Sequence, residues 1–193
     1  SGEFGWVGTT LKEEDLSPQI EAETFDVTPP ADWFDLSPQL FPQPTLMNKI
    51  GTTAPTFEFP TVDGNRVSLS DLEGKTVVID FWATWCGPCR EGMPHLAEAS
   101  KQLAGEDVVF LGMNLDEPGD DRKAKVRDFV QQAGAEFTQL LPPDLEGIQE
   151  AYGVEVLPTL IVVGRDGNIQ DFHKGTAPKP ESLIGWIRSL KSE

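Results

Sequence analysis

Residues 76–94 decide the fold: they read TVVIDFWATWCGPCREGMP and contain both cysteines of the 193-residue chain. The first seven of them, Thr76 to Trp82, form a continuous apolar run rich in β-branched side chains. Such a run is typical of a central strand that is buried on both faces. We expect a helix to begin around the CGPC at 86–89 and to continue to about Ala104. The sequence therefore predicts two cysteines at the junction of a buried strand and a helix.

The position of Cys86 at this junction favours a reactive thiol. Unpaired backbone N–H groups and the positive end of the helix dipole stabilise a thiolate at a helix N-terminus. They lower the pKa of the thiol below the value of about 8.5 for free cysteine. Cys89 lies one turn further along, less exposed, where it can act as the resolving thiol. Gly87 allows a tight turn, and Pro88 fixes φ in the first turn without the loss of a needed donor.

Three other interpretations of the CxxC compete with a redox couple. A zinc site needs two more ligands, and His95 and His173, which we expect to be surface or packing residues, are the only imidazoles. A structural disulfide across so short a loop restricts the unfolded chain little. A pair of free structural thiols leaves the strand-to-helix placement unexplained. We favour the redox couple, because this context for CxxC is specific.

The rest of the chain from residue 51 alternates between strand and helix patterns. Residues 56–72 indicate a hairpin that turns at Asp63-Gly64. Further strands are expected at 108–114, near 138, and at 159–163 and 168–173, the last two joined across Asp166-Gly167. Helices are expected at 122–133, 144–152 and 181–190. This order predicts an α/β fold with a mixed central sheet and helices on both faces.

The bulk composition excludes several classes of function. The formal net charge of −17 leaves no basic stripe for phosphates, so we expect no nucleic-acid partner. No run of about 18 apolar residues is present, so we expect no transmembrane segment. The chain starts at Ser1 without a signal-peptide pattern, and we interpret it as a processed or excised form. Its acidity favours basic or neutral partners at long range.

The composition changes near residue 50. Residues 1–50 hold nine acidic residues, two basic residues and six of the sixteen prolines, a pattern that breaks helix and strand periodicity. They also carry large apolar side chains such as Trp33, Phe34 and Phe41, too many for a plain disordered linker. We predict that residues 1–47 are an acidic, proline-rich extension, either the tail of an upstream domain or a tag-derived start. Residues 48–193 are then one domain.

The motif DFWATWCGPC, Pro94 and LPTLIVV at 157–163 resemble thioredoxin. The early hairpin and the long insertion before LPTLIVV resemble the TlpA/ResA branch of the thioredoxin-like superfamily, which are extracytoplasmic, often membrane-anchored thiol–disulfide oxidoreductases. The resemblance covers about residues 48–192. It implies a thioredoxin-like fold with an N-terminal β-hairpin extension. It also implies an extracytoplasmic or periplasmic location, with a membrane anchor outside this chain.

The resemblance implies catalytic roles for Asp80 and Glu117. The family places a buried carboxylate at the position of Asp80, and burial in an apolar strand raises the pKa of such a group. The implied role is to accept the proton of Cys89 when that thiol resolves a mixed disulfide. The alternative is an Asp turned toward solvent or hydrogen-bonded at the sheet edge. Glu117 aligns with a Glu that ResA-like members place near the active site, although NLDEPGDD also fits an ordinary acidic loop.

The resemblance also implies a substrate-binding set around the dithiol. The family has Pro158 in cis opposite the CxxC, where the preceding backbone groups can pair with an extended substrate. We expect Leu157 to line the substrate groove, and Trp85 to border and shield the dithiol. Gly87 and Pro88, between the cysteines, complete the set.

The predicted function is thiol–disulfide exchange through the CGPC dithiol. Reduction of protein disulfides is the favoured direction, because Gly-Pro separates the cysteines as in thioredoxin. No metal or other cofactor is needed beyond the Cys86–Cys89 pair. In TlpA-like systems a membrane electron donor of the DsbD/CcdA type reduces the pair again. The implied substrates are disulfides in extracytoplasmic proteins, including apocytochrome c.

Rival functions stay open at this point. A peroxiredoxin-like peroxidase needs Thr or Ser three residues before its reactive cysteine, whereas this chain has Ala83 there and Thr84 one position later. A copper-handling protein of the same fold uses CxxxC with a distant His, and the spacing here is one residue short. The first 50 residues could also dock a partner without any chemistry.

Overall fold

The structure, a computed structural model, describes residues 46–190. The predicted extension at 1–47 therefore lies outside the described residues, apart from Leu46 and Met47. Leu46 is fully buried and belongs to an apolar cluster of the domain that follows. A short 3₁₀ helix, η4 (Met47–Lys49), comes next.

A five-stranded sheet forms the centre of the described residues, in the order β5-β4-β3-β6-β7. Strand β3 pairs in parallel with β4, which pairs in parallel with β5, while β6 is antiparallel to both β3 and β7. The predicted mixed sheet is confirmed. The strands are β3 (Thr76–Trp82), β4 (Val108–Asn114), β5 (Thr138–Leu140), β6 (Thr159–Val163) and β7 (Ile169–Lys174).

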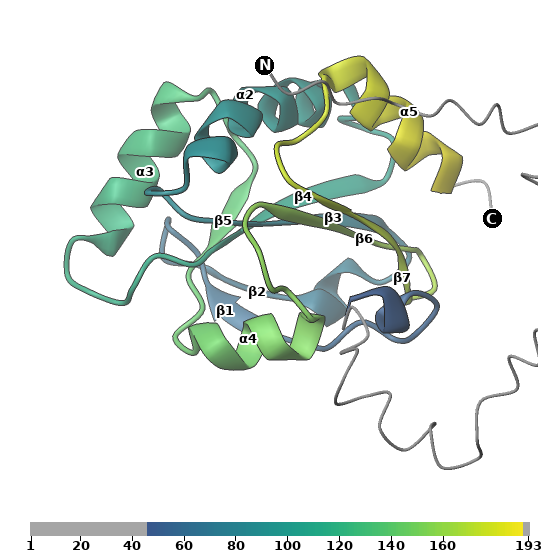
Figure 1. Cartoon of the computed structure of the whole chain (residues 1–193), viewed down its shortest axis with the longest axis horizontal. Helices are drawn as coiled ribbons and strands as arrows, with labels where there is room; N and C mark the ends of the chain where they lie inside the picture. The colour runs from purple at the N-terminus through teal and green to yellow at the C-terminus, as the bar shows by residue number, and fades with distance from the viewer. Residues whose placement is uncertain (1–45, 191–193) are drawn as a thin grey trace, which may run out of the picture. The chain divides into compact units, whose positions relative to one another are not determined.

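Helices cover both faces of this sheet (Figure 1). Residues of α2, α3 and α5 share one apolar cluster on one face, and residues of α4 join a second cluster on the other. The predicted thioredoxin-like arrangement is confirmed, with helix ends within two residues of the expected ones. The helices are α2 (Gly87–Gln102), α3 (Arg122–Gln132), α4 (Leu145–Tyr152) and α5 (Pro180–Leu190).

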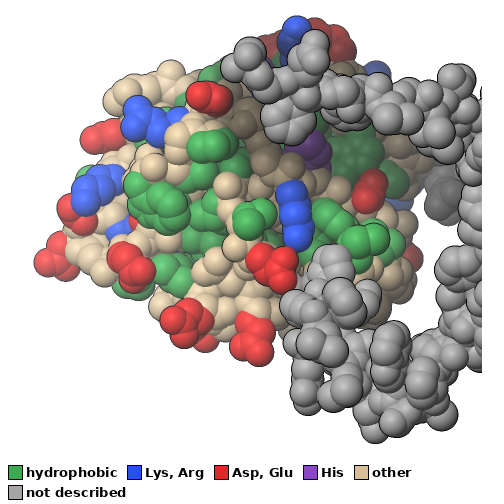
Figure 2. Space-filling view, viewed as in Figure 1, with side chains coloured by type: hydrophobic (Ala, Val, Ile, Leu, Met, Phe, Trp, Pro, Cys, Tyr) green, Lys and Arg blue, Asp and Glu red, His purple; other side chains and the backbone are tan. Residues whose placement is uncertain are grey.

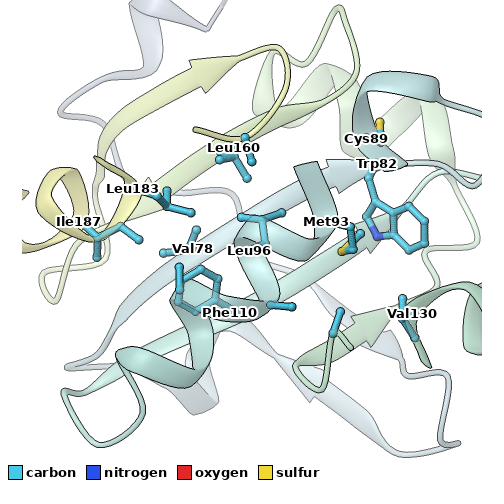
Figure 3. Close-up of a cluster of buried hydrophobic side chains, with 14 of the residues drawn as sticks. Val78, Trp82, Cys89, Met93, Leu96, Phe110, Val130, Leu160, Leu183 and Ile187 are labelled. Carbon is cyan, nitrogen blue, oxygen red and sulfur yellow. The ribbon is translucent and has the colours of Figure 1, made fainter. Parts of the chain in front are cut away.

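Strand β3 separates the two clusters, and all seven of its residues are buried. Val78 and Trp82 belong to the cluster under α2, together with Cys89 and Met93, as Figure 3 shows. The alternate residues, such as Ile79, belong to the cluster on the α4 side. Since side chains alternate along a strand, Asp80 lies on the α2 face, between Val78 and Trp82.

The predicted N-terminal hairpin is present, with two short strands. Strands β1 (Glu58–Pro60) and β2 (Arg66–Ser68) pair antiparallel, and Gly64 in the turn has φ 91°. Strand β2 ends at Ser68 because this residue caps a 3₁₀ helix, η5 (Leu69–Leu72). Its side chain accepts the Ser70 N–H, and the Asp71 carboxylate accepts the Ser68 N–H. This capping box ends the strand earlier than the alternating sequence indicates.

The segment before β3 also hydrogen-bonds to both outer strands of the large sheet. At β7, the Gly51 N–H donates to the Ile169 carbonyl at 2.7 Å, and the Ile169 N–H donates to the Thr52 carbonyl at 2.9 Å. At β5, the Val62 N–H donates to the Gln139 carbonyl at 2.9 Å. One stretch of chain therefore occupies part of each sheet edge.

Candidate active site

Cys86 lies where the sequence predicts it, at the N-cap of α2, four residues after the end of β3. Its backbone is extended, with φ −80° and ψ 109°, and its Sγ accepts the Cys89 N–H at 3.2 Å. The Cys86 N–H donates to the Ala83 carbonyl at 3.2 Å, which closes a turn over residues 83–86. We call these four residues the active-site turn. A sulfur in this position faces the free N–H groups of the helix end, which favour a negative charge.

Cys86 and Cys89 are joined by a disulfide bond. Cys86 is 6% exposed and Cys89 is 2% exposed, so the predicted difference in accessibility is present but small. The structure therefore shows the oxidised pair, with Cys86 as the sulfur nearer to solvent.

Asp80 lies in the interior of the strand and is 3% exposed. Its Oδ1 has no hydrogen-bond partner within the described part of the chain. Burial raises the pKa of this carboxyl from 3.8 to about 8. The alternative of a solvent-facing Asp80 is wrong. A carboxyl with this pKa can accept or release a proton near neutral pH.

The peptide bond between Leu157 and Pro158 is cis, as predicted. Pro158 directly precedes β6, the antiparallel neighbour of β3, and its carbonyl accepts the Gly175 N–H at 2.9 Å. This bond ties the cis segment to the end of β7.

A groove of about 580 Å³ opens beside the disulfide. It contains four of the five predicted substrate-binding residues and the predicted Glu117, and Pro158 adjoins it through Leu157. The full lining is Trp85, Cys86, Gly87, Pro88, Leu115, Glu117, Leu145, Glu146, Gln149, Glu155, Val156 and Leu157.

Two apolar side chains of this groove are open to solvent. Trp85 is 69% exposed and Val156 is 50% exposed, two of the four exposed large apolar residues in the described chain. Trp85 borders the dithiol as predicted, but it projects outward instead of covering it. The groove beside the disulfide therefore has apolar as well as polar lining.

Acidic side chains also line this groove. Glu117, Glu146 and Glu155 line the groove, and Glu155 forms an ion pair with Lys174 at 3.2 Å. Figure 2 shows acidic side chains spread along the edge of the face that carries α3 and α4. Sequence reasoning missed Glu146 and Glu155, because the approach of α4 and of the chain after it to the CGPC depends on the sheet topology and not on a local pattern.

A second polar group, in the loop after β4, was also missed. Asp116 and Arg122 are each 6% exposed and Asn114 is fully buried. The Asp116 Oδ1 accepts both the backbone N–H and the hydroxyl of Thr84, each at 3.0 Å. Residues 114–122, NLDEPGDDR, could have indicated this group, because polar residues directly follow a buried strand there. The run of acidic residues is instead typical of an exposed loop.

The two histidines are half-buried packing residues, as expected. The Nδ1 of His95 lies 2.9 Å from the Ala177 carbonyl, and the Nε2 of His173 lies 3.1 Å from the Thr176 carbonyl. Within residues 46–190 no three His, Cys, Asp or Glu side chains gather closely enough to hold a metal ion. Among these same residues, every helix is too short or too polar to span a bilayer.

Comparison with protein families and with known proteins agrees with this site. The sequence profile of the AhpC/TSA family matches residues 50–172. The thiol-disulfide oxidoreductase ResA of Bacillus subtilis (strain 168) is 34% identical over 134 residues, which is 69% of this chain and 71% of ResA.

Two solved structures share the arrangement of the described residues. A protein from Chlorobium tepidum, assigned as the thiol:disulfide interchange protein DsbE, superposes with a TM-score of 0.63 at 32% identity, covering 72% of this chain and 94% of that one. A secreted disulfide oxidoreductase of Mycobacterium tuberculosis, homologous to Escherichia coli DsbE, gives a TM-score of 0.58 at 26% identity, covering 69% and 95%.

Proposed function

We propose that this chain, which belongs to the AhpC/TSA family of thioredoxin-like proteins, reduces disulfide bonds in other proteins. It is a thiol–disulfide oxidoreductase, and its redox centre is the Cys86–Cys89 pair. The direction of exchange and the protein substrate are our proposal. The observation that carries it is the position of this pair, at the N-terminus of α2 and beside an open groove, on the same face of β3 as Asp80, whose Oδ1 has no hydrogen-bond partner among the described residues.

The first step begins from the reduced pair. The Cys86 thiolate attacks one sulfur of the substrate disulfide, and an S–S bond between Cys86 and the substrate forms as the substrate bond breaks. The second substrate sulfur leaves as a thiolate and takes a proton from solvent. The helix N-terminus favours the thiolate that this step requires.

The second step releases the substrate. Cys89 gives its proton to the ionised Asp80 carboxylate and attacks the Cys86 sulfur. The bond between Cys86 and the substrate breaks, and the remaining substrate sulfur leaves as a thiolate. The substrate has gained two electrons, and the pair has become the disulfide that the structure contains.

The substrate segment is proposed to lie in the groove. Trp85 and Leu157 supply apolar contacts on either side of Cys86, and Gly87 leaves space at the sulfur. Pro158 sets the direction of the chain before β6, where backbone groups can pair with an extended peptide. Glu117 is proposed to act from the rim of the groove, through its charge.

A peroxidase function is not favoured. Such an enzyme needs a hydroxyl near the reactive cysteine that is free to contact a peroxide. The Thr84 hydroxyl donates to Asp116 instead, at 3.0 Å, and the residue before it is Ala83. The CxxC pair and the open groove fit exchange with a protein better.

The partners and the location extend this proposal. A reductase needs electrons from elsewhere, so we propose a membrane donor of the DsbD/CcdA type and a location outside the cytoplasm, in the periplasm and held by an anchor. A similar structure is that of a secreted oxidoreductase, which supports the location. Apocytochrome c is the proposed substrate among extracytoplasmic thiol proteins. We also propose that residues 1–47 form an extension that precedes a single domain at residues 48–193.

A trapping experiment tests the reductase function. With Cys89→Ser, Cys86 can form a mixed disulfide but nothing resolves it, so a protein substrate stays linked and can be identified by mass spectrometry. The matched control is Cys86→Ser, which should link nothing. The parent should also reduce insulin disulfides with dithiothreitol faster than Cys86→Ser does. Equal rates, together with an empty trap on a folded protein, would rule the reductase out.

A further inference from the structure

We infer that Asp116 is a positioning residue for the dithiol: by holding the active-site turn, it sets how readily Cys86 and Cys89 close into a disulfide. The inference rests on the exchange function proposed above. Asp116 accepts hydrogen bonds from Thr84 and Asn114, and it acts on the cysteines through Thr84.

Asp116 contacts the active-site turn through two hydrogen bonds. One carboxylate oxygen, Oδ1, accepts the Thr84 backbone N–H and the Thr84 hydroxyl, both at 3.0 Å. Thr84 is the second residue of the turn that the Cys86 N–H closes onto the Ala83 carbonyl. The Leu115 N–H also donates to the Trp82 carbonyl at 2.7 Å, just before the turn. The loop after β4 thus holds the chain that leads to Cys86 at two neighbouring points.

Asp116 is itself held by a buried frame. Its Oδ2 accepts the Asn114 side-chain amide at 3.0 Å, and its N–H donates to the Asn114 Oδ1 at 3.2 Å. The guanidinium of Arg122 donates to the Asn114 side chain at 3.1 Å, to the Asn114 carbonyl, and to the Pro142 carbonyl at 2.8 Å. These bonds join the end of β4, the first residue of α3 and the chain after β5.

A carboxylate held this way has its position fixed by three elements of the fold. Buried hydrogen-bonded networks are rigid when every member has its partners, and the named atoms of Asp116, Asn114 and Arg122 all do. The turn therefore has one preferred place relative to α2, which carries Cys89. The two sulfurs are held near bonding distance by the fold before they react, and such positioning raises the effective concentration of one group at another.

The step that depends on this position is closure. Cys89 attacks the Cys86 sulfur of the mixed disulfide, the Cys86–Cys89 bond forms, and the substrate sulfur leaves as a thiolate with the electron pair of the broken bond. If the turn is free to move, Cys86 spends less time in line with Cys89. Closure then becomes slower, and the closed disulfide becomes less favoured against two separate thiols.

Equilibration with glutathione measures this directly, since it needs no physiological substrate. We expect Asp116→Ala to lower the equilibrium constant for closing the pair about tenfold, which is about 30 mV toward a less negative potential for a two-electron couple. Thr84→Val removes one of the two bonds and should lower the constant about threefold. In the Asp116→Ala background Thr84→Val should add nothing, because both act through the same contact.

Two further variants separate positioning from charge. Asp116→Asn loses the charge and keeps an oxygen for Thr84, but its amide NH₂ group then faces the Asn114 side-chain amide, so its closing constant should fall by less than that of Asp116→Ala. Asp120→Ala, an exposed residue of the same loop, should match the parent. A closing constant that is lower in Asp116→Asn than in Asp116→Ala would show that the charge matters more than the contact and would overturn the inference, as would an unchanged constant in Asp116→Ala.

The outcomes also separate this inference from the function beneath it. A parent that does not exchange with glutathione at all counts against both. A parent that exchanges normally, with Thr84→Val and Asp116→Ala unchanged, counts against the positioning role alone. Thr84→Val alters a half-buried side chain and carries the test if Asp116→Ala does not fold.

Discussion

Two buried aspartates of this protein lie in opposite environments. Asp80, inside β3, is 3% exposed and its Oδ1 has no partner in the described chain, while Asp116, after β4, is 6% exposed and accepts three hydrogen bonds. An unpartnered carboxyl in an apolar interior favours its neutral form, so it is suited to gain and lose a proton. A fully bonded carboxylate is suited to hold other groups in place. Burial alone therefore does not reveal the role of an acidic residue.

The largest expected effect is on the pH dependence of stability, and it tests whether the buried Asp80 carboxyl lacks a hydrogen-bond partner at Oδ1. Burial raises the pKa of its carboxyl from the ordinary value of 3.8, which applies to the unfolded chain, to about 8 in the folded protein. Between these values the folded form keeps a proton that the unfolded form has lost, so stability falls as pH rises from about 4 to about 8. The slope is at most about 1.4 kcal/mol per pH unit.

In Asp80→Asn this slope should disappear, and the variant should be more stable than the parent at pH 8 by several kcal/mol. Urea unfolding of the oxidised protein at a series of pH values measures it. Asp128→Asn, an exposed position on α3, is the matched control and should keep the parent slope. Parallel curves for Asp80→Asn and the parent would mean that Asp80 has a partner after all.

The next effect tests the bonded frame around Asp116. Arg122→Met removes the donor for the Asn114 and Pro142 carbonyls and one of the two donors to the Asn114 Oδ1, and leaves the two carbonyls buried without this partner. Each such group is destabilising by about 1–3 kcal/mol, so a total loss of about 3 kcal/mol is expected in urea unfolding. The neighbouring exposed residue provides the control, because Lys123→Met should change stability by less than about 0.5 kcal/mol.

A kinetic prediction contrasts the two aspartates in one step. With Cys86 linked to 5-thio-2-nitrobenzoate, closure by Cys89 releases a coloured thiolate whose absorbance gives the rate. Asp80→Asn should slow this release about a hundredfold near pH 7 and remove its rise toward about pH 8, because the proton acceptor is gone. Asp116→Ala should slow release by the same factor at every pH. Identical pH profiles for the two variants would abolish the distinction between them.

The smallest effect belongs to an exposed carboxylate. Glu117 lines the groove and is open to solvent, so its charge is screened. Glu117→Gln should reduce by about threefold the preference for a disulfide peptide flanked by Lys over one flanked by Glu, at low salt only. Glu73→Gln, at the opposite end of β3 from the groove, should leave the preference unchanged. A loss that persists at about 1 M salt would contradict a role through charge.

Local patterns were sufficient for much of the fold. Strands β3, β4 and β6 have the predicted bounds, because each is an apolar run between polar or turn residues. Asp80 was found for the same reason, since a single acid stands out in TVVIDFW. The range of 56–72 predicted for the hairpin was too long at its end, because Ser68 caps a 3₁₀ helix over Leu69–Leu72.

The tertiary part of the site was not readable from the chain. Thr84 and Asp116 are 32 residues apart and meet only because β3 and β4 are parallel neighbours whose ends lie together. Glu146 reaches the groove from α4 for a similar reason. A pattern that could have indicated the hydrogen bonds around Asp116 is the presence of polar residues directly after two neighbouring parallel strands.

The hydrogen bonds from residues 51–62 to β5 and β7 bear on how readily the protein aggregates at high concentration. Unpaired strand edges are where two copies of a sheet protein join and begin to aggregate. Here one short run of the chain occupies part of both outer strands, through Gly51 and Thr52 on one side and Val62 on the other. Residues 51–62, which carry no catalytic group, therefore protect the sheet edges against pairing with a second copy of the chain.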